Sequence, residues 1–216
     1  KQKTAYEIYK CDWSSDVCSS DLNPKVLNQI TTFYSCGTFG DPMMNKDVIE
    51  MCRYAKETNP NLYVHFHTNG GARKEDWWKE LATVLPENHR VIFAIDGLED
   101  THHLYRIGTK YETVLKNAQA FISAGGIAEW AFIKFLHNEH QVDEARQRAN
   151  ALGFKYFTTK NSSRFLIEPR SPAVDRDGNI THYIEPASYT PIKFVDKKII
   201  EDRKSTRLNS SHTDIS

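Results

Sequence analysis

Residues 30–160 alternate between two patterns of hydrophobic and polar positions. Short runs rich in β-branched and aromatic residues predict strands, at 30–36, 62–68, 91–95, 128–136 and 154–159. Amphipathic segments between these runs predict helices, at 45–58, 74–85, 111–124 and 141–152. A strand followed by a helix in every unit of about 30 residues predicts an α/β fold with a parallel sheet or barrel.

Boundary signals support this interpretation. Asn45 is the expected N-cap of the first helix, and Asn59-Pro60-Asn61 ends that helix. The run at 91–95 is almost wholly apolar, which is typical of a parallel strand buried on both faces. After residue 161 prolines interrupt the pattern, and Asp177-Gly178 predicts a hairpin turn.

The two ends of the chain differ from this middle part. Residues 12–22 and 202–212 are polar and serine-rich, and their codons can be written as opposite strands of one DNA segment. Both segments resemble translated sequencing-adapter DNA. We therefore expect both ends to be non-native and to make few contacts with the middle part, which would be a fragment of a longer gene. The expected divisions are non-native 1–22, a core fragment at 23–160, a loop-rich extension at 161–201 and non-native 202–216.

Composition narrows the classes of function. The chain has 216 residues, with 28 basic and 28 acidic side chains. A net charge of zero excludes a generic polyanion binder, so no nucleic-acid partner is expected. No apolar run reaches the roughly 18 residues of a membrane span, and no basic-plus-apolar leader opens the chain. The four cysteines match neither zinc-finger spacing nor a disulfide scaffold, so we expect a reducing, cytoplasmic setting without a membrane partner.

Polar residues follow each of the first four predicted strands. Gly40-Asp41-Pro42 follows the first strand, Asn69 the second, Asp96 the third and Asn138 the fourth. Parallel strands connected by right-handed crossovers place their carboxyl ends on one edge, where α/β proteins keep their sites. We therefore expect these residues to meet at one strand-end cleft.

Three segments resemble the radical S-adenosylmethionine (radical SAM) enzymes. CGTFGDPMMN at 36–45 is similar to that family's Gly-Gly-Glu-Pro segment, and HTNGGAR at 67–73 to its Thr-Asn-Gly strand end. IDGLEDTHHLYRIGTKYETVLKNAQAFISAGG at 95–126 is similar to its Asp-Gly, Arg-x-Gly and helix segment. The resemblance implies a partial (β/α)6 barrel of radical SAM type, missing its first strand, with relatives that carry a SPASM-type auxiliary domain.

The resemblance also implies S-adenosylmethionine (SAM) and a 4Fe-4S cluster as cofactors. The family's Cys-x3-Cys-x2-Cys loop is absent from this sequence, and we expect it upstream of Asn23. No residue of the fragment is therefore expected to bind the metal or to act catalytically, and the fragment alone is expected to be inactive. The parent enzyme would use an external electron donor and start hydrogen abstraction from an unknown substrate, with a peptide among the candidates.

The matched family positions point to seven residues of the SAM site and suggest roles for five of them. Asp41, between Gly40 and Pro42, would accept hydrogen bonds from the SAM ammonium group, although Asp replaces the usual Glu. Asn69 would contact the ribose or carboxylate edge of SAM, and Asp96 the ribose hydroxyls. Arg106 would hold the SAM carboxylate with its planar fork, and Asn138 would contact adenosine.

Two other functions fit parts of the sequence. His65 and His67 lie on one face of a strand, so a barrel-type metal hydrolase is one alternative, with Asp96, His102 and His103 as further ligands. A non-catalytic α/β nucleotide-binding domain is the other alternative. Cys36 and Cys52 are expected to be buried thiols in any of these cases.

Overall fold

The structure of the protein is a computed structural model that describes residues 23–36, 40–166, 169–175 and 177–188. The expectations for the two ends, 1–22 and 202–216, lie outside these residues, as does part of the first motif, 37–39. Among the described residues, no helix is both long and apolar enough to span a membrane.

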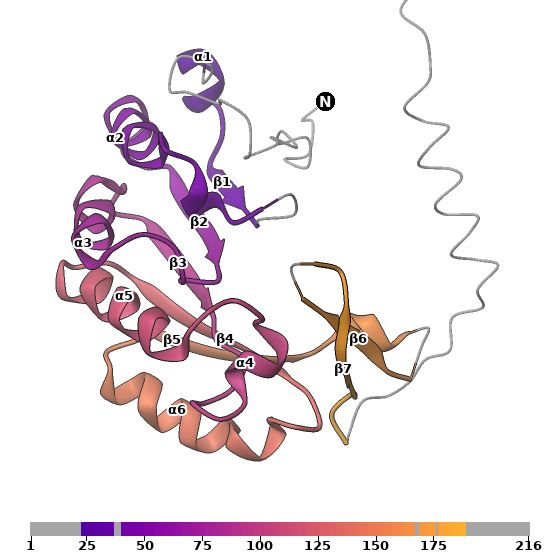
Figure 1. The fold of residues 1–216 in the computed structure, drawn as a ribbon. Coiled ribbons are helices and arrows are strands. Elements are labelled where there is room, and N and C mark those ends of the chain that lie inside the picture. Colours follow the sequence, from indigo (N-terminus) through magenta and orange to yellow (C-terminus); the bar gives the residue numbers. More distant parts are fainter. Residues whose placement is uncertain (1–22, 37–39, 167–168, 176, 189–216) are drawn as a thin grey trace, which may run out of the picture.

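A five-stranded parallel sheet forms the centre of the protein, as Figure 1 shows. Its strands are β1 (Thr32–Ser35), β2 (Tyr63–Thr68), β3 (His89–Ala94), β4 (Ala128–Lys134) and β5 (Tyr156–Asn161). They lie side by side in chain order, and all four pairings are parallel. The predicted strands and their order are therefore confirmed, with ends shifted by a few residues.

Four helices lie along one face of the curved sheet (Figure 1). They are α2 (Val48–Thr58), α3 (Glu75–Val84), α5 (Tyr111–Ser123) and α6 (Val142–Ala151), each close to its predicted position. The sequence pattern did not predict the short elements α1 (Pro24–Leu27), α4 (His102–Tyr105), η2 (Pro42–Met44), η3 (Glu139–Gln141) and η4 (Ser163–Leu166). Of these, η2 and α4 follow the ends of β1 and β3, so they shape the carboxyl edge of the sheet.

The two faces of the sheet differ in chemistry because side chains alternate along each strand. Toward the helices, strand residues such as Phe93 and Trp130 are fully buried, and Phe93 packs against the rings of Trp78 and Phe121. The opposite face is polar. There Arg90 Nη1 donates to Glu129 Oε2 at 3.0 Å, and His67 Nε2 lies 2.5 Å from the Tyr34 hydroxyl. The polar side chains of this face therefore bond to one another.

Two local predictions are corrected by the structure. The residue that precedes α2 is Asp47, and Asn45 lies further upstream, where its Oδ1 accepts a hydrogen bond from the Asp47 backbone N–H at 2.8 Å. The helix starts late because η2 occupies the residues immediately before Asn45. Cys36 is exposed, since it follows the last residue of β1 at the sheet edge, whereas Cys52 is buried as expected.

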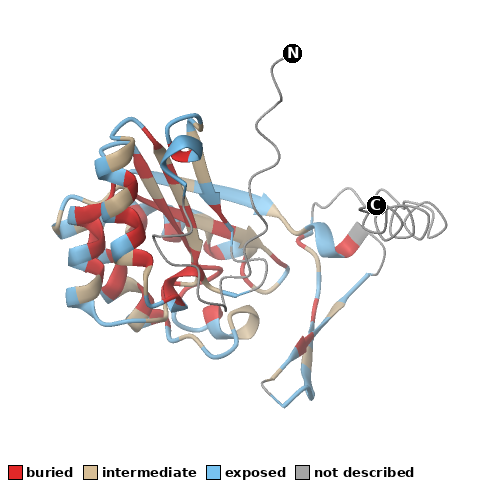
Figure 2. Cartoon of the chain, turned by 90° about the horizontal axis from the view of Figure 1, so that it is seen from above, coloured by how far each residue is buried: buried red, intermediate tan, exposed pale blue. Residues whose placement is uncertain are grey.

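An antiparallel hairpin of β6 (Ser171–Val174) and β7 (Ile180–Ile184) follows the parallel sheet. Asp175 closes its turn, because its Oδ1 accepts hydrogen bonds from the backbone N–H groups of Asp177 and Asn179. Gly178 has a φ of 87°, which confirms the predicted Asp177-Gly178 turn. The hairpin extends beyond the helix-covered sheet in Figure 2.

A second, smaller core attaches the hairpin to the sheet. It consists of Phe135, Phe165, Ala173 and Ile184, with Tyr105 and Ile133 packed against it. His182 Nε2 also lies 2.9 Å from the Leu104 carbonyl oxygen of α4. These contacts hold the hairpin close to the carboxyl edge of β3 and β4.

A substitution at Gly70 tests how tightly the turn after β2 is packed. Its φ of 69° disfavours a side chain, and a Cβ there would lie 2.8 Å from both the Phe93 ring and the Val114 side chain. We expect Gly70→Ala to lower the free energy of unfolding by about 2–4 kcal/mol, measured by urea denaturation with tryptophan fluorescence. Gly125→Ala is the control, because Gly125 has a φ of 92° but a Cβ there would have no other atom within 4 Å. Equal losses in the two variants would contradict the packing argument.

Candidate functional site

Asp41 joins the turn after β1 to the end of β2. Its Oδ2 accepts hydrogen bonds from the Asn69 backbone N–H at 2.7 Å and the Thr68 hydroxyl at 2.9 Å. Its Oδ1 caps η2 by accepting from the Met43 backbone N–H at 3.0 Å. The carboxylate thus fixes two strand ends relative to each other, with Pro42 buried beside it.

The turn after β2 has a defined shape. The Asn69 side chain accepts a hydrogen bond from the Gly71 backbone N–H at 2.9 Å, and the Thr68 hydroxyl accepts one from Gly70 N–H at 2.9 Å. Asn117 of α5 donates to the Gly70 carbonyl oxygen at 2.8 Å. These contacts hold Asn69 at the carboxyl edge of the sheet.

Asp96 and Arg106 form an ion pair at the end of β3. Asp96 has no exposed surface, and Arg106 Nε donates to its Oδ2 at 2.7 Å. The Ile133 backbone N–H of β4 donates to Asp96 Oδ1 at 2.5 Å. Burial raises the pKa of Asp96, and the Arg106 guanidinium opposes that rise. Two residues that were each expected to contact SAM therefore bind each other.

Asn138 completes this buried group. It is fully buried, and its Nδ2 donates to the carbonyl oxygens of Asp96 at 3.1 Å and Ile133 at 3.0 Å. Its Oδ1 accepts from the Phe135 backbone N–H at 2.7 Å. Asn138 therefore holds the ends of β3 and β4 together.

A cavity of about 370 Å³ opens at this edge. Asn69 and Arg106 line it, together with Tyr105, Thr109, Arg164 and residues of the β6–β7 hairpin. Arg106 is the link between the buried Asp96 and this space, because only its Nε is used by the carboxylate. Of the seven residues singled out in the sequence, two line the cavity. Asp41, Asp96 and Asn138 lie at the same strand-end edge, bonded within the protein.

His102 of α4 is buried behind this edge. Its Nε2 lies 3.0 Å from the Thr109 hydroxyl, and its Nδ1 has no hydrogen-bond partner in the described part of the chain. Burial, with the nearby Arg106 and His103, lowers the pKa of His102 to about 4. The imidazole is therefore neutral at pH 7.

His65 and His67 lie on the polar face of β2, as their spacing predicted. Burial lowers the pKa of both imidazoles, so both are neutral at pH 7. The His65 ring packs against the rings of Tyr34, in a tilted arrangement, and Tyr63, edge to face, with centroids 5.6 and 4.2 Å away. Across the described ranges, no three His, Cys, Asp or Glu residues are grouped so that they could hold a metal ion. The structure therefore gives the metal-hydrolase alternative no support.

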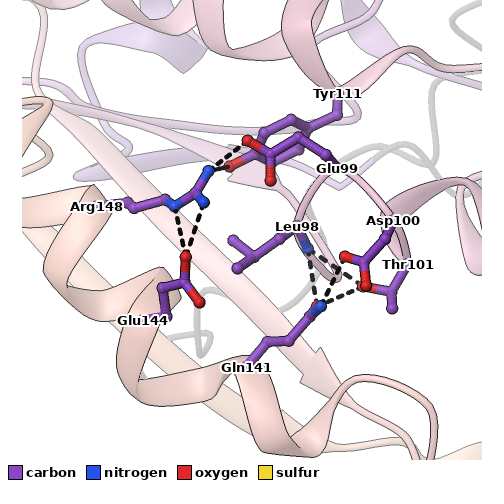
Figure 3. Close-up of polar contacts among 8 residues, drawn as sticks. All are labelled: Leu98, Glu99, Asp100, Thr101, Tyr111, Gln141, Glu144 and Arg148. Atoms are coloured by element: carbon purple, nitrogen blue, oxygen red, sulfur yellow. Dashed lines mark hydrogen bonds and ion pairs between the residues drawn. The ribbon is translucent and has the colours of Figure 1, made fainter.

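A set of contacts that sequence reasoning missed fixes the loop after β3. Gln141 accepts a hydrogen bond from the Leu98 backbone N–H at 3.0 Å and donates to Asp100 at 2.7 Å, as Figure 3 shows. Arg148 of α6 pairs with Glu99 of the loop and with Glu144 (Figure 3). The sequence gives no signal for the contacts to the loop, since they join residues about 40 positions or more apart.

Comparison with known proteins identifies similar folds. No protein-family model matches the chain, and no curated protein sequence matches it. Among solved structures, Streptococcus suis SuiB matches at a TM-score of 0.58 and 14% identity, covering 90% of this chain and 41% of SuiB. SuiB bound to S-adenosylmethionine matches at 0.56, with 13% identity and the same coverage. Native anSMEcpe with bound AdoMet and Kp18Cys peptide matches at 0.55 and 18% identity, covering 91% of this chain and 53% of that chain.

At these identities the comparison shows a shared fold. The parallel sheet and its helices belong to the class of α/β folds that SuiB and anSMEcpe adopt. The chain spans about half or less of the length of these proteins.

The contribution of the Asp96–Arg106 ion pair can be measured as a change in the free energy of unfolding. Asp96→Asn keeps the size of the side chain but leaves the Arg106 charge without its partner. We expect a loss of about 2–4 kcal/mol in the free energy of unfolding by chemical denaturation. Glu99→Gln, which breaks an exposed pair with Arg148, should cost no more than about 1 kcal/mol. A loss for Asp96→Asn as small as that of the control would contradict the role given to the pair.

His102 makes stability depend on pH. Its folded pKa of about 4 lies below the unfolded value of about 6.5, so the unfolded chain binds more protons between these values. Stability should therefore fall as the pH falls from about 6.5 toward about 4, with a contribution from His102 of about 2 kcal/mol at pH 5. His102→Gln should reduce the difference in unfolding free energy between pH 7 and pH 5 by that amount. Unchanged pH dependence in the variant would contradict the assignment.

Proposed function

We propose that this chain is part of a radical SAM enzyme and that it binds SAM at the carboxyl edge of its parallel sheet. The observation that carries the proposal is Arg106, which a buried carboxylate holds at the wall of a cavity on that edge. The fold neighbours SuiB and anSMEcpe are radical SAM enzymes, and structures of both contain bound SAM. Their likeness supports SAM as the ligand of this chain.

The described residues fit one end of SAM. Arg106 has its remaining guanidinium nitrogens available for the amino-acid carboxylate, and Asn69 lies on the same cavity. Asp41 shapes the turn that would face the SAM ammonium group, and its carboxylate remains our proposed acceptor. Asp96 and Asn138 would act by holding Arg106 and the ends of β3 and β4, while direct contacts to ribose and adenosine stay predictions.

The described residues do not fit an iron–sulfur cluster. Such a cluster needs several thiolates close together, and Cys36 and Cys52 lie on a strand end and a helix. Burial raises the pKa of Cys52 to about 12, so this thiol stays protonated. We propose that cysteines of the longer parent protein hold the cluster, and we assign no step of the reaction to it here.

The chemistry of the parent enzyme would come from its cofactor. SAM, when bound and cleaved reductively, supplies the group that abstracts hydrogen from a substrate. The part of this chain is to bind and orient SAM, through Arg106 and Asn69, and to keep water from the strand ends through the apolar hairpin wall. The proposal also includes an external electron donor. It includes a peptide substrate because SuiB was solved with the precursor peptide SuiA and anSMEcpe with peptides.

SAM binding by the 216-residue chain tests the placement of the site. Isothermal titration calorimetry should detect SAM binding, and Arg106→Gln should weaken it by about tenfold or more, since glutamine cannot make a charge-assisted hydrogen bond to the carboxylate. Arg53→Gln is the matched control, because Arg53 pairs with Glu50 and Glu80 on helices away from the cavity. Equal affinities of the two variants would contradict the proposed site.

A further inference from the structure

The cavity at the carboxyl edge has two different walls. Arg106 and Arg164 supply its charged side, while Pro172, Val174 and Ile184 of the hairpin supply an apolar side. No acidic residue is among the described residues that line it. A ligand that fits both walls therefore carries a negative charge next to an apolar group.

Arg164 is the cation of this wall that has no counter-charge among the described residues. Arg106 is already paired with the buried Asp96, whereas the Arg164 side chain makes no ion pair within the described ranges. Its guanidinium carbon lies 5.6 Å from the centre of the Tyr105 ring, within cation–π range. The guanidinium thus lies beside an aromatic ring, and no described residue neutralises its charge.

The support beneath Arg164 is well packed. Tyr105 packs on Phe135 with ring centroids 4.5 Å apart, and Phe135 packs on Phe165, the neighbour of Arg164, at 6.1 Å. Phe135 and Phe165 are almost fully buried. Because this aromatic cluster fixes both Tyr105 and the backbone next to Arg164, less side-chain freedom is lost when Arg164 binds a ligand.

A carboxylate is the group that suits this position. A guanidinium can donate two parallel hydrogen bonds to a carboxylate, and the apolar hairpin wall lowers the local exposure to water. Val174 is 43% exposed, so it offers apolar surface that a ligand can cover. Within a peptide, an aspartate or glutamate beside an aliphatic residue presents this combination.

We propose that the cavity between α4 and the β6–β7 hairpin binds a carboxylate-bearing peptide segment. Arg164 receives the carboxylate, and the neighbouring aliphatic side chain packs on Val174 and Ile184. The proposed function places SAM on the Arg106 side of the same edge, and this proposal rests on that placement. It adds the class of peptide substrate that the proposed function leaves open.

Two blocked dipeptides test the proposal with the chain as it exists. N-acetyl-Leu-Asp-amide carries the carboxylate, and N-acetyl-Leu-Asn-amide is its neutral counterpart of nearly equal size. Calorimetric titration at low ionic strength should show about fivefold tighter binding of the acidic peptide. Arg164→Gln should abolish this preference.

Arg170→Gln is the matched control variant. Arg170 is also an arginine stacked on a tyrosine, with its guanidinium carbon 4.3 Å from the Tyr183 ring centre, but it does not line this cavity. It should keep the preference for the acidic peptide. Equal binding of the two peptides, or equal loss of preference in the two arginine variants, would overturn the proposal.

Titration of the peptide in the presence of saturating SAM tests whether the peptide carboxylate and the SAM carboxylate bind at different positions. Peptide affinity should change by less than about twofold if the two ligands occupy different sides of the edge. Competitive displacement of the peptide by SAM would overturn the proposal, since Arg164 would then serve the SAM carboxylate. Acid-selective peptide binding that depends on Arg164, without any SAM binding, would support this site and contradict the proposed function.

Discussion

A single buried carboxylate holds together the edge of the sheet on which the proposed function depends. Asp96 has no contact with solvent, and a charge in such a place is costly unless other groups compensate it. Arg106 and the Ile133 backbone N–H provide that compensation. The same bonds join the loop after β3 to β4 and hold one guanidinium at the cavity wall. Stability and the proposed ligand binding therefore depend on the same ion pair.

The two faces of the sheet carry different kinds of side chain. The helix-covered face carries the large buried aromatics, such as Phe93 and Trp130, which supply most of the hydrophobic stabilisation. The opposite face and the strand ends carry polar groups that bond to one another, including Arg90 with Glu129. A parallel sheet permits this division, since its strands end on one edge and its loops can vary without disturbing the core. The hairpin then adds an apolar wall to that edge.

Most of the fold could be predicted from the sequence, because strands and helices have different hydrophobic periods and the turns between them are marked by glycine, proline and asparagine. The site was predictable only in part. Asn69 was found from its place after a strand and Arg106 from the resemblance to radical SAM enzymes. The pairing of Arg106 with Asp96 could not be predicted, because it depends on how the loop after β3 folds back. Arg164 was missed because it follows the last strand of the parallel sheet, where no periodic pattern remains. Cys36 was wrongly expected to be buried, since composition does not reveal that its position lies beyond the edge of the sheet.

Reductive cleavage of SAM by the longer parent protein that we propose tests the central claim most directly. The parent, reconstituted anaerobically with iron and sulfide and then given dithionite and SAM, should produce methionine and 5′-deoxyadenosine. Replacing Arg106 by Gln in the parent should reduce the rate at low SAM concentration by about tenfold or more while the cluster absorbance stays unchanged, because the partner that we propose for Arg106 is the SAM carboxylate and not the cluster. A parent protein that assembles its cluster, binds SAM and yet forms no 5′-deoxyadenosine would contradict the account.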